Sequence, residues 1–551
     1  MPKSSRLLLI LALLFTVNVN ALPIEGHKVL ISGPSRQATE VGRQIAASGG
    51  NVVDVAIGVA LALSVTGPYF ASLGGGGLAL IKMNGSVDAI DFREVAPQAT
   101  SRDYFKDLPK DASQTGGHAI AVPGIPAGLW AIHKKYGKLN WGKLFDGPLK
   151  LANKGFPVSG EWVSNTADES RRFNRRANQV FKKNGSQPYK PGEVLFQPEL
   201  GRALAELKAK NSKGFYEGPV AKDIVQSVIA AGGKMTLQDL KSYKVRWLSP
   251  ISMDFEGHKI YLMPPPSSGG VVIQTALKLI EKSDIKNRTI ALSADEYHLL
   301  AEIEARAFRG RFLLGDPDFH QNPLAFLASD KYIEELNSSL NLKKSIALKP
   351  LDNKAPSPES SETTHLSVMD NEGHAVAMTL TLNGNYGSGV VTEQYGITLN
   401  NQMDDFTTRP SQPNMYNLIQ GPGNEVEPGK RPLSSMSPTL VENNGRVTLA
   451  IGSPGGPRII SGVLQTLYRI LVRGMDVDMA IQAARVHHQF LPNTLFVDRQ
   501  RFSPEILTEL GERGHNVQES PMGRVYVVRL RPDGILEAAY DSRGEGDAGG
   551  I

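Results

Sequence analysis

Hydrophobic and polar positions follow two different periods along the chain, and the period changes after residue 362. Residues 38–65 predict two helices separated at Gly49-Gly50, and the second is apolar on nearly every face, which is typical of an interior helix. Residues 200–210 and 294–314 carry apolar residues at helical spacing and predict helices that cover a sheet. The first part of the chain is therefore expected to be rich in helices.

Strand patterns dominate the second part. Residues 364–369 and 374–382 alternate between polar and apolar positions on either side of Asp370-Asn371-Glu372-Gly373, as in a β-hairpin. Three more strands and two helices are predicted in the order 447–451, 463–472 (helix), 478–486 (helix), 525–530 and 535–540. Helices in the first part and strands in the second indicate a layered α/β fold.

A run of four glycines, 74–77, precedes the apolar residues 78–81 and predicts a close approach of backbones at the entry to a central strand. A phosphate-binding loop would need Lys-Ser or Lys-Thr after the glycines, and neither follows. We therefore expect no nucleotide site here.

A Pro/Ser/acidic stretch, residues 350–362, is the one plausible linker, and it leads directly into the strand pattern at Thr363. On this stretch alone, a loop entering a strand explains the residues. The chemical alternative is cleavage of the Glu362–Thr363 bond, which would leave Thr363 with a β-hydroxyl and a free α-amine, a nucleophile with its own base.

The composition fits a globular enzyme. Of 551 residues, 41% are hydrophobic and 21% charged, enough for a large core. The chain has no cysteine, which excludes disulfides, thiolate metal sites and a cysteine nucleophile. The histidines form no H-E-x-x-H pattern, and His487-His488 is expected on a helix, where adjacent side chains diverge, so we expect no catalytic metal.

The first 21 residues resemble an export signal, with Lys3 and Arg6, the apolar residues 7–17, and a small-residue site at Val19-Asn20-Ala21. An uncleaved anchor is the alternative. Removing this segment lowers the formal charge from +5 to +3, which is too mild to indicate nucleic acid. The basic run between Arg171 and Lys183 is expected to be a solvated helix face. We expect a periplasmic protein, or alternatively a secreted one.

Residues 363–405 resemble the start of the small subunit of γ-glutamyltranspeptidases. Other blocks resemble family motifs in the family's order, so the resemblance covers nearly the whole mature chain. They are Asp91-Phe92-Arg93-Glu94, Ala121-Val122-Pro123-Gly124, Pro264-Pro265-Pro266-Ser267-Ser268-Gly269-Gly270, Pro432-Leu433-Ser434-Ser435-Met436-Ser437-Pro438 and Gly452-Ser453-Pro454-Gly455-Gly456.

This resemblance implies the N-terminal-nucleophile hydrolase fold, a four-layer αββα sandwich built jointly from two cleavage products. It also implies a precursor that cuts itself into a large subunit, residues 22–362, and a small subunit, residues 363–551, which form a heterodimer. Thr363 would be the nucleophile, assisted by Thr381, and the backbone N–H groups of Gly455 and Gly456 would bind the oxyanion. No cofactor is implied.

The resemblance further implies a pocket for the charged end of a γ-glutamyl donor such as glutathione. Arg93 matches the carboxylate-binding arginine, with Ser434 and Ser435 assisting it, and Asn383, Gln402 and Asp405 match the group that holds the ammonium. From the charge logic we expect the cation and the acid to be placed apart. Residues 410–421 match a lid with Tyr416 as its gate, although a plain surface loop would also fit. Acceptors would be water, amino acids or dipeptides.

The chain departs from the family at Gly384-Asn385-Tyr386-Gly387 and in its Gly-rich C-terminal tail, which leaves acceptor preference open. Two alternatives remain at this point. A same-fold acylase or poly-γ-glutamate transferase would use another donor, and Asp405 and the lid argue against both. A non-catalytic exported binding protein would not cut itself.

Overall fold

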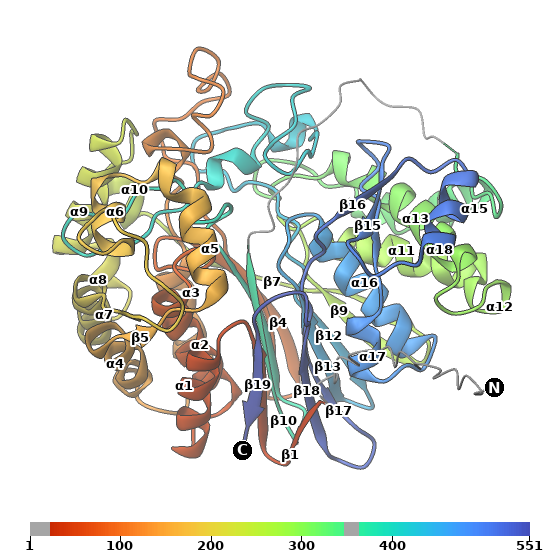
Figure 1. Ribbon diagram of the computed structural model, residues 1–551, viewed down its shortest axis with the longest axis horizontal. Coiled ribbons are helices and arrows are strands. Elements are labelled where there is room, and N and C mark those ends of the chain that lie inside the picture. Colours follow the sequence, from red (N-terminus) through yellow and green to blue (C-terminus); the bar gives the residue numbers. More distant parts are fainter. Residues whose placement is uncertain (1–22, 347–362) are drawn as a thin grey trace, which may run out of the picture.

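The computed structural model describes residues 23–346 and 363–551, so the predicted signal segment and Glu362 lie outside the described residues. Two seven-stranded sheets stand face to face in the middle of the molecule, with one layer of helices on each outer side (Figure 1). The four-layer αββα sandwich that the family resemblance implies is confirmed, and its four layers follow from burying both faces of both sheets.

One sheet holds the start of the predicted small subunit. Its strand order is β19 (Asp547–Gly550), β2 (Val29–Gly33), β10 (Thr364–Asp370), β11 (Ala375–Thr381), β3 (Gly76–Met83), β4 (Ser86–Phe92) and β7 (Arg246–Leu248). The hairpin β10–β11 lies between β2 and β3, all antiparallel. Strands from both sides of residue 362 are therefore interleaved in one sheet.

The glycines at the start of β3 allow the close approach that the sequence predicts. A Cβ on Gly75 would lie 2.1 Å from the carbonyl oxygen of Thr381, and one on Gly77 would lie 2.6 Å from that of Thr379. Any larger residue at these positions would push β3 away from β11.

The other sheet also mixes both parts of the chain, in the order β1 (Ile24–Gly26), β18 (Leu536–Tyr540), β17 (Tyr526–Leu530), β13 (Arg446–Gly452), β12 (Thr439–Asn443), β9 (His258–Leu262) and β8 (Ile251–Phe255). Smaller sheets are formed by β14 (Val486–His487), β15 (Leu495–Asp498) and β16 (Val517–Ser520), and by β5 (Phe156–Pro157) and β6 (Val194–Leu195).

Helices of the first part cover the β10–β11 sheet (Figure 1). All fifteen residues of α2 are buried, as its uniform apolar sequence predicts, and Asn51 and Asp54 form a capping box at its start. The helices of this layer are α1 (Arg36–Ala47), α2 (Val52–Thr66), α3 (Ile125–Tyr136), α4 (Asp146–Lys154), α5 (Gly160–Glu169), α6 (Arg175–Phe181), α7 (Pro198–Lys210), α8 (Lys213–Tyr216), α9 (Gly218–Ala230) and α10 (Leu237–Lys241).

The opposite layer covers the other sheet (Figure 1). It contains α11 (Gly269–Ser283), α12 (Ile285–Arg288), α13 (Ala294–Arg309), α14 (Leu324–Leu327), α15 (Asp330–Ser338), α16 (Arg458–Leu471), α17 (Val477–Gln482) and α18 (Pro504–Glu512). Among the described residues, no helix has the length and apolar character needed to cross a bilayer.

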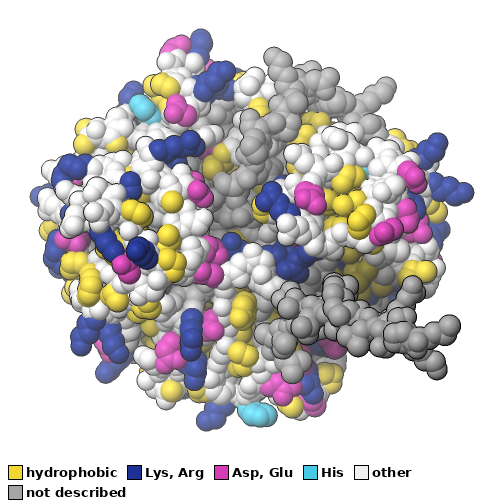
Figure 2. Space-filling view, viewed as in Figure 1, with side chains coloured by type: hydrophobic (Ala, Val, Ile, Leu, Met, Phe, Trp, Pro, Cys, Tyr) yellow, Lys and Arg dark blue, Asp and Glu magenta, His cyan; other side chains and the backbone are white. Residues whose placement is uncertain are grey.

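The basic run is only partly the solvated face that the sequence predicts. Arg171 and Arg175 are exposed, but Arg172 donates hydrogen bonds to the carbonyl oxygens of Gln114, Asn385 and Gly387. The prediction is wrong for Arg172, because charge patterning does not reveal a contact with a loop more than 200 residues away. On the face drawn in Figure 2, basic and acidic side chains are interspersed.

Candidate active site

Thr363 lies directly before β10 and is 8% exposed. Its Oγ1 lies 3.3 Å from Oγ1 of Thr381, the last residue of β11. The backbone N–H of Asn383 donates to Thr381 Oγ1 over 2.8 Å. The Thr381 hydroxyl proton is thereby available to Thr363, which is the arrangement expected of a group that orients a nucleophile.

The turn after β13 brings Gly455 and Gly456 next to this threonine. Their φ angles are +124° and +54°, which favour glycine. A Cβ on Gly456 would lie 2.6 Å from Cδ1 of Tyr416, so this position has no space for a side chain. Gly456 and Thr363 line the same cavity, and α16 begins two residues later, so the turn presents backbone N–H groups at a helix start.

The cavity at Thr363 is lined by buried charges. Arg93, 1% exposed, pairs with Asp405, lies 3.5 Å from Glu94 Oε2, and donates through Nε to the Pro432 carbonyl oxygen. Gln402 Nε2 donates to Asp405 Oδ2 over 2.6 Å. The expectation that the cation and the acid stand apart is wrong for this structure, because two charges removed from water are most stable in contact.

Burial dominates the protonation of these carboxyl groups. It raises the pKa of Asp405, although Arg93 and Arg311 act in the opposite direction. It raises the pKa of Glu94 to about 7, again against Arg93, and one oxygen of Glu94 has no hydrogen-bond partner among the described residues. Buried charged groups with shifted pKa values in one cavity are typical of a site that binds an ionic ligand.

Arg311 is a second buried cation in this cavity, and the sequence reasoning missed it. Burial lowers its pKa to about 10, and its guanidinium donates to Ser268 Oγ and Gln420 Oε1. Residues 294–314 were predicted only as a covering helix. Arg311 in fact follows α13 in a 3₁₀ turn, and its side chain lines the cavity. Helical spacing of apolar residues gave no sign of this contact.

The remaining predicted residues line the same cavity of ≈ 20 Å³. The backbone N–H of Met436 donates to Ser434 Oγ, Ser435 is 8% exposed, and Asn383 Nδ2 donates to the Asn401 carbonyl oxygen. Tyr416, in the predicted lid, donates its hydroxyl to the carbonyl oxygen of Asn383 over 2.6 Å. The structure thus brings together every predicted site residue except Gly455, which adjoins the lining residue Gly456.

Comparison with known proteins identifies the family of this chain. The family model described as Gamma-glutamyltranspeptidase matches residues 38–551. The chain belongs to this family. It is 39% identical, over 95% of its own length and 92% of the relative's, to a glutathione hydrolase proenzyme of Escherichia coli.

Solved structures support the fold of this family member. A cephalosporin acylase from Bacillus halodurans matches all of this chain and 98% of its own with a TM-score of 0.84, and at 22% identity it shows the fold alone. A gamma-glutamyltranspeptidase from Pseudomonas nitroreducens, complexed with L-DON, is 34% identical with a TM-score of 0.54 over 57% of this chain and 95% of that chain.

The raised pKa of Glu94 predicts a pH dependence of stability in this γ-glutamyltranspeptidase. A carboxyl whose pKa rises from 4.5 to about 7 on folding stabilises the fold below about pH 4.5, and this contribution is lost as the pH rises through 7. In a Thr363→Ala background, which is expected to remain one chain, Glu94→Gln should reduce the loss of unfolding free energy between pH 5 and pH 8 by about 3 kcal/mol. Urea denaturation at both pH values measures the free energy of unfolding. Equal losses in Thr363→Ala and in the double variant with Glu94→Gln would contradict the prediction.

Gln489 contacts the predicted lid from outside the pocket, and the sequence analysis did not identify it. Its Nε2 donates to the carbonyl oxygens of Tyr416 and Asn417 at 3.2 and 3.3 Å, and its Oε1 lies 2.9 Å from His487 Nε2. His487 contacts Ser461 of α16 through Nδ1. A buried chain of hydrogen bonds therefore links the helix after Gly455-Gly456 to the backbone of the lid.

This segment also corrects the predicted helix over 478–486. The helix α17 ends at Gln482, and His487 lies on β14 while His488 follows it, both fully buried. The backbone N–H of His488 donates to Glu304, and Gln465 donates to the Val486 carbonyl oxygen. A short apolar run cannot be assigned by periodicity when partners distant in sequence decide its conformation.

Loss of the Gln489 amide should loosen the lid. Gln489→Ala removes both bonds to the lid backbone, so we expect KM for a γ-glutamyl donor to rise about fivefold with a smaller change in kcat. Chymotrypsin should cut the chain after Tyr416, which is buried in the parent protein, faster than in the parent protein. Gln482→Ala, on α17, is the matched control, and an unchanged KM in Gln489→Ala would remove this residue from the account.

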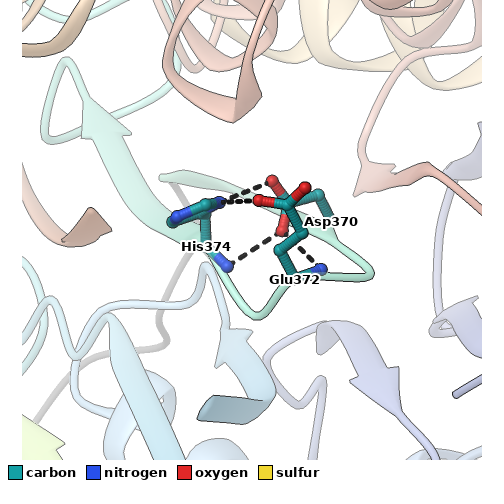
Figure 3. Close-up of side chains that lie close together, drawn as sticks. All are labelled: Asp370, Glu372 and His374. Carbon is teal, nitrogen blue, oxygen red and sulfur yellow. Dashed lines mark hydrogen bonds and ion pairs between the residues drawn. The ribbon is translucent and has the colours of Figure 1, made fainter. Parts of the chain in front are cut away.

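One group among the described residues has the geometry to ligate a metal ion, and it lies away from the pocket. Asp370, Glu372 and His374 sit on the hairpin between β10 and β11, with their ligand atoms within 4.8 Å of one another (Figure 3). Asp370 and Thr363 lie at opposite ends of β10, about 20 Å apart at the rise of a strand. Asp370 also accepts the backbone N–H groups of Glu372 and His374, which accounts for the cluster as a turn.

Proposed function

We propose that this chain is a γ-glutamyltransferase and glutathione hydrolase made as a precursor that cuts itself before Thr363. Thr363 Oγ attacks the carbonyl carbon of residue 362, the peptide C–N bond breaks to leave an ester, and water hydrolyses that ester. The products are a large subunit, residues 22–362, and a small subunit, residues 363–551. Cleavage turns a backbone amide into an amine with a pKa near ~8, which can accept protons at neutral pH.

The observation that carries the function is the presence of Thr363 in one cavity with Arg93 and Asp405. A γ-glutamyl donor ends in an α-carboxylate and an α-ammonium, and the guanidinium and carboxylate of this buried pair complement those two charges. Arg93 can hold a carboxylate through two parallel N–H bonds, and Ser434 and Ser435 lie beside it in the lining. Asn383 and Gln402 join Asp405 at the ammonium.

In the reaction, Thr363 Oγ attacks the γ-carbonyl carbon and its proton passes to the Thr363 amine. The Gly455 and Gly456 N–H groups stabilise the oxyanion, which for one such donor typically contributes ~3 kcal/mol. The leaving amine takes the proton as the C–N bond breaks, and a γ-glutamyl ester remains on Thr363. Water or the amine of an acceptor then attacks this ester and frees the threonine.

The buried Asp405 also separates this function from acylases of the same fold. A glutaryl group lacks the α-ammonium, so a bound glutaryl donor would offer no positive charge to the Asp405 carboxylate. Purified protein should release p-nitroaniline from γ-glutamyl-p-nitroanilide, faster with glycylglycine, and glutamate from glutathione. Glutaryl-p-nitroanilide differs only in the α-amino group and is the matched control. Equal rates on the two anilides would move the assignment to the acylases.

We also propose that the protein is exported, on the strength of the predicted signal in residues 1–21. Fractionation of cells expressing the full chain should recover the mature form in the periplasm, or in the medium if it is secreted, with its N-terminus near Leu22. Recovery of the full-length chain in the membrane fraction would support the uncleaved anchor instead.

A further inference from the structure

A second cavity opens on Thr363 and is much larger than the first. It measures ≈ 320 Å³, against ≈ 20 Å³ for the cavity that holds Arg93 and Asp405. Thr363 is the one residue common to the two linings. The nucleophile therefore stands at the junction of a small charged pocket and a roomier one, and a group that attacks or leaves the acyl carbon has space in the latter.

The larger cavity is rich in carboxylates. Its lining includes Glu161, Asp168 and Glu169 of α5, and one cation, Arg524. Glu161 pairs with Arg524 at 2.6 Å, and Glu169 pairs with Arg172 at 2.6 Å. Asp168 is exposed and forms no hydrogen bond or ion pair within residues 23–346 and 363–551, so its charge is not offset by a direct partner there.

Arg524 can take part in binding as well as in pairing. One nitrogen, Nη1, donates to Glu161, and the side chain is 22% exposed. Burial acts to lower the pKa of Arg524, but the nearby Glu161 and Tyr526 outweigh it and raise this pKa above its ordinary value, so Arg524 keeps its charge. A guanidinium has N–H groups beyond the one used by Glu161, and these can receive a carboxylate.

We propose that this second cavity binds the acceptor, and that Asp168 and Glu169 make it select amino acids or dipeptides with a cationic side chain. The inference rests on the proposed function. The acceptor carboxylate meets Arg524, its neutral amine faces the ester on Thr363, and a lysine or arginine side chain lies toward the end of α5. The helix dipole adds negative potential at that end.

The transfer step balances within these groups. The acceptor amine nitrogen forms a bond to the ester carbonyl carbon, and the C–O bond to Thr363 breaks. The proton lost by the amine passes through the Thr363 α-amine to Thr363 Oγ. The product is a γ-glutamyl amide of the acceptor, and the cationic side chain takes no part beyond binding.

The test compares lysine with norleucine, which has a similar length without the charge, as acceptors from γ-glutamyl-p-nitroanilide. The quantity is the ratio of kcat/KM for lysine to that for norleucine, taken within each protein so that a general loss of activity cancels. Asp168→Asn should lower this ratio about threefold, and Asp168→Lys should lower it further. In the parent protein, 1 M salt should also lower it, since ions screen the attraction.

Glu335→Gln is the matched control, because Glu335 is an exposed acid on α15 on the other side of the two sheets (Figure 1). It should leave the ratio and the basal hydrolysis unchanged. The same ratio in the parent and in an active Asp168→Asn protein would overturn the acceptor proposal alone. A parent protein that releases no dye from the donor would overturn the proposed function, and the acceptor site with it.

Discussion

Thr363→Ala should leave the protein as one chain and abolish its activity on γ-glutamyl-p-nitroanilide. The hydroxyl at this position performs two reactions in the proposed scheme, attack on the preceding carbonyl and attack on the donor. Removing the nucleophile of an acyl-transfer enzyme lowers kcat by on the order of 10⁶-fold, so the remaining dye release should be at the assay limit.

Thr363→Ser is the matched variant, since it keeps the hydroxyl and removes one methyl group. It should cut itself, if more slowly, and retain measurable dye release. Thr381→Ala should slow both reactions without abolishing them, because Thr381 acts on Thr363 through the 3.3 Å contact between their hydroxyls. A denaturing gel and the dye assay read both reactions. Two chains from Thr363→Ala would contradict the nucleophile assignment.

Arg93→Lys is expected to have the second largest effect. A lysine keeps the charge but cannot contact Asp405, Glu94 and the Pro432 carbonyl at once, nor hold a carboxylate through two parallel bonds. Changes to a buried, hydrogen-bonded charge typically cost about 3 kcal/mol, which corresponds to about a hundredfold in kcat/KM. Most of it should appear as a higher KM, since the carboxylate is bound before the reaction begins.

Self-cleavage separates this effect from misfolding. The precursor reaction uses no donor carboxylate, so Arg93→Lys should still yield two chains. Arg529→Lys is the matched control: Arg529 lies on β17, 3.9 Å from Glu537 and away from the cavity, and its loss should leave KM unchanged. An unchanged KM in Arg93→Lys would remove Arg93 from the donor site.

Local patterns in the sequence predict local structure well. The hairpin β10–β11 follows from alternation on either side of a four-residue turn, and α2 follows from its apolar run. The pairing of β2 with β10 and of β3 with β11 could not be predicted this way, since those partners lie hundreds of residues apart. The four-layer sandwich was predicted only through the resemblance to γ-glutamyltranspeptidases.

In the site, too, the identity of residues could be predicted from the sequence, but their long-range contacts could not. Motif resemblance pointed to Thr363, Arg93 and Asp405, but it could not show that the two charges pair directly. Arg311 and Gln489 were missed because each acts on the pocket or lid from an element assigned to another role, and Gln489 reaches residues more than 70 positions away. Contacts of that kind depend on the tertiary fold and leave no local pattern.

The most direct test of the account is the mass of the protein during turnover. Protein mixed with γ-glutamyl-p-nitroanilide, quenched in acid within one turnover and digested, should show two chains divided between Glu362 and Thr363. One γ-glutamyl group should be attached to the peptide that begins at Thr363, as an ester that hydroxylamine removes. An active protein that is a single chain, or one that carries the γ-glutamyl group on another residue, would contradict the central claim.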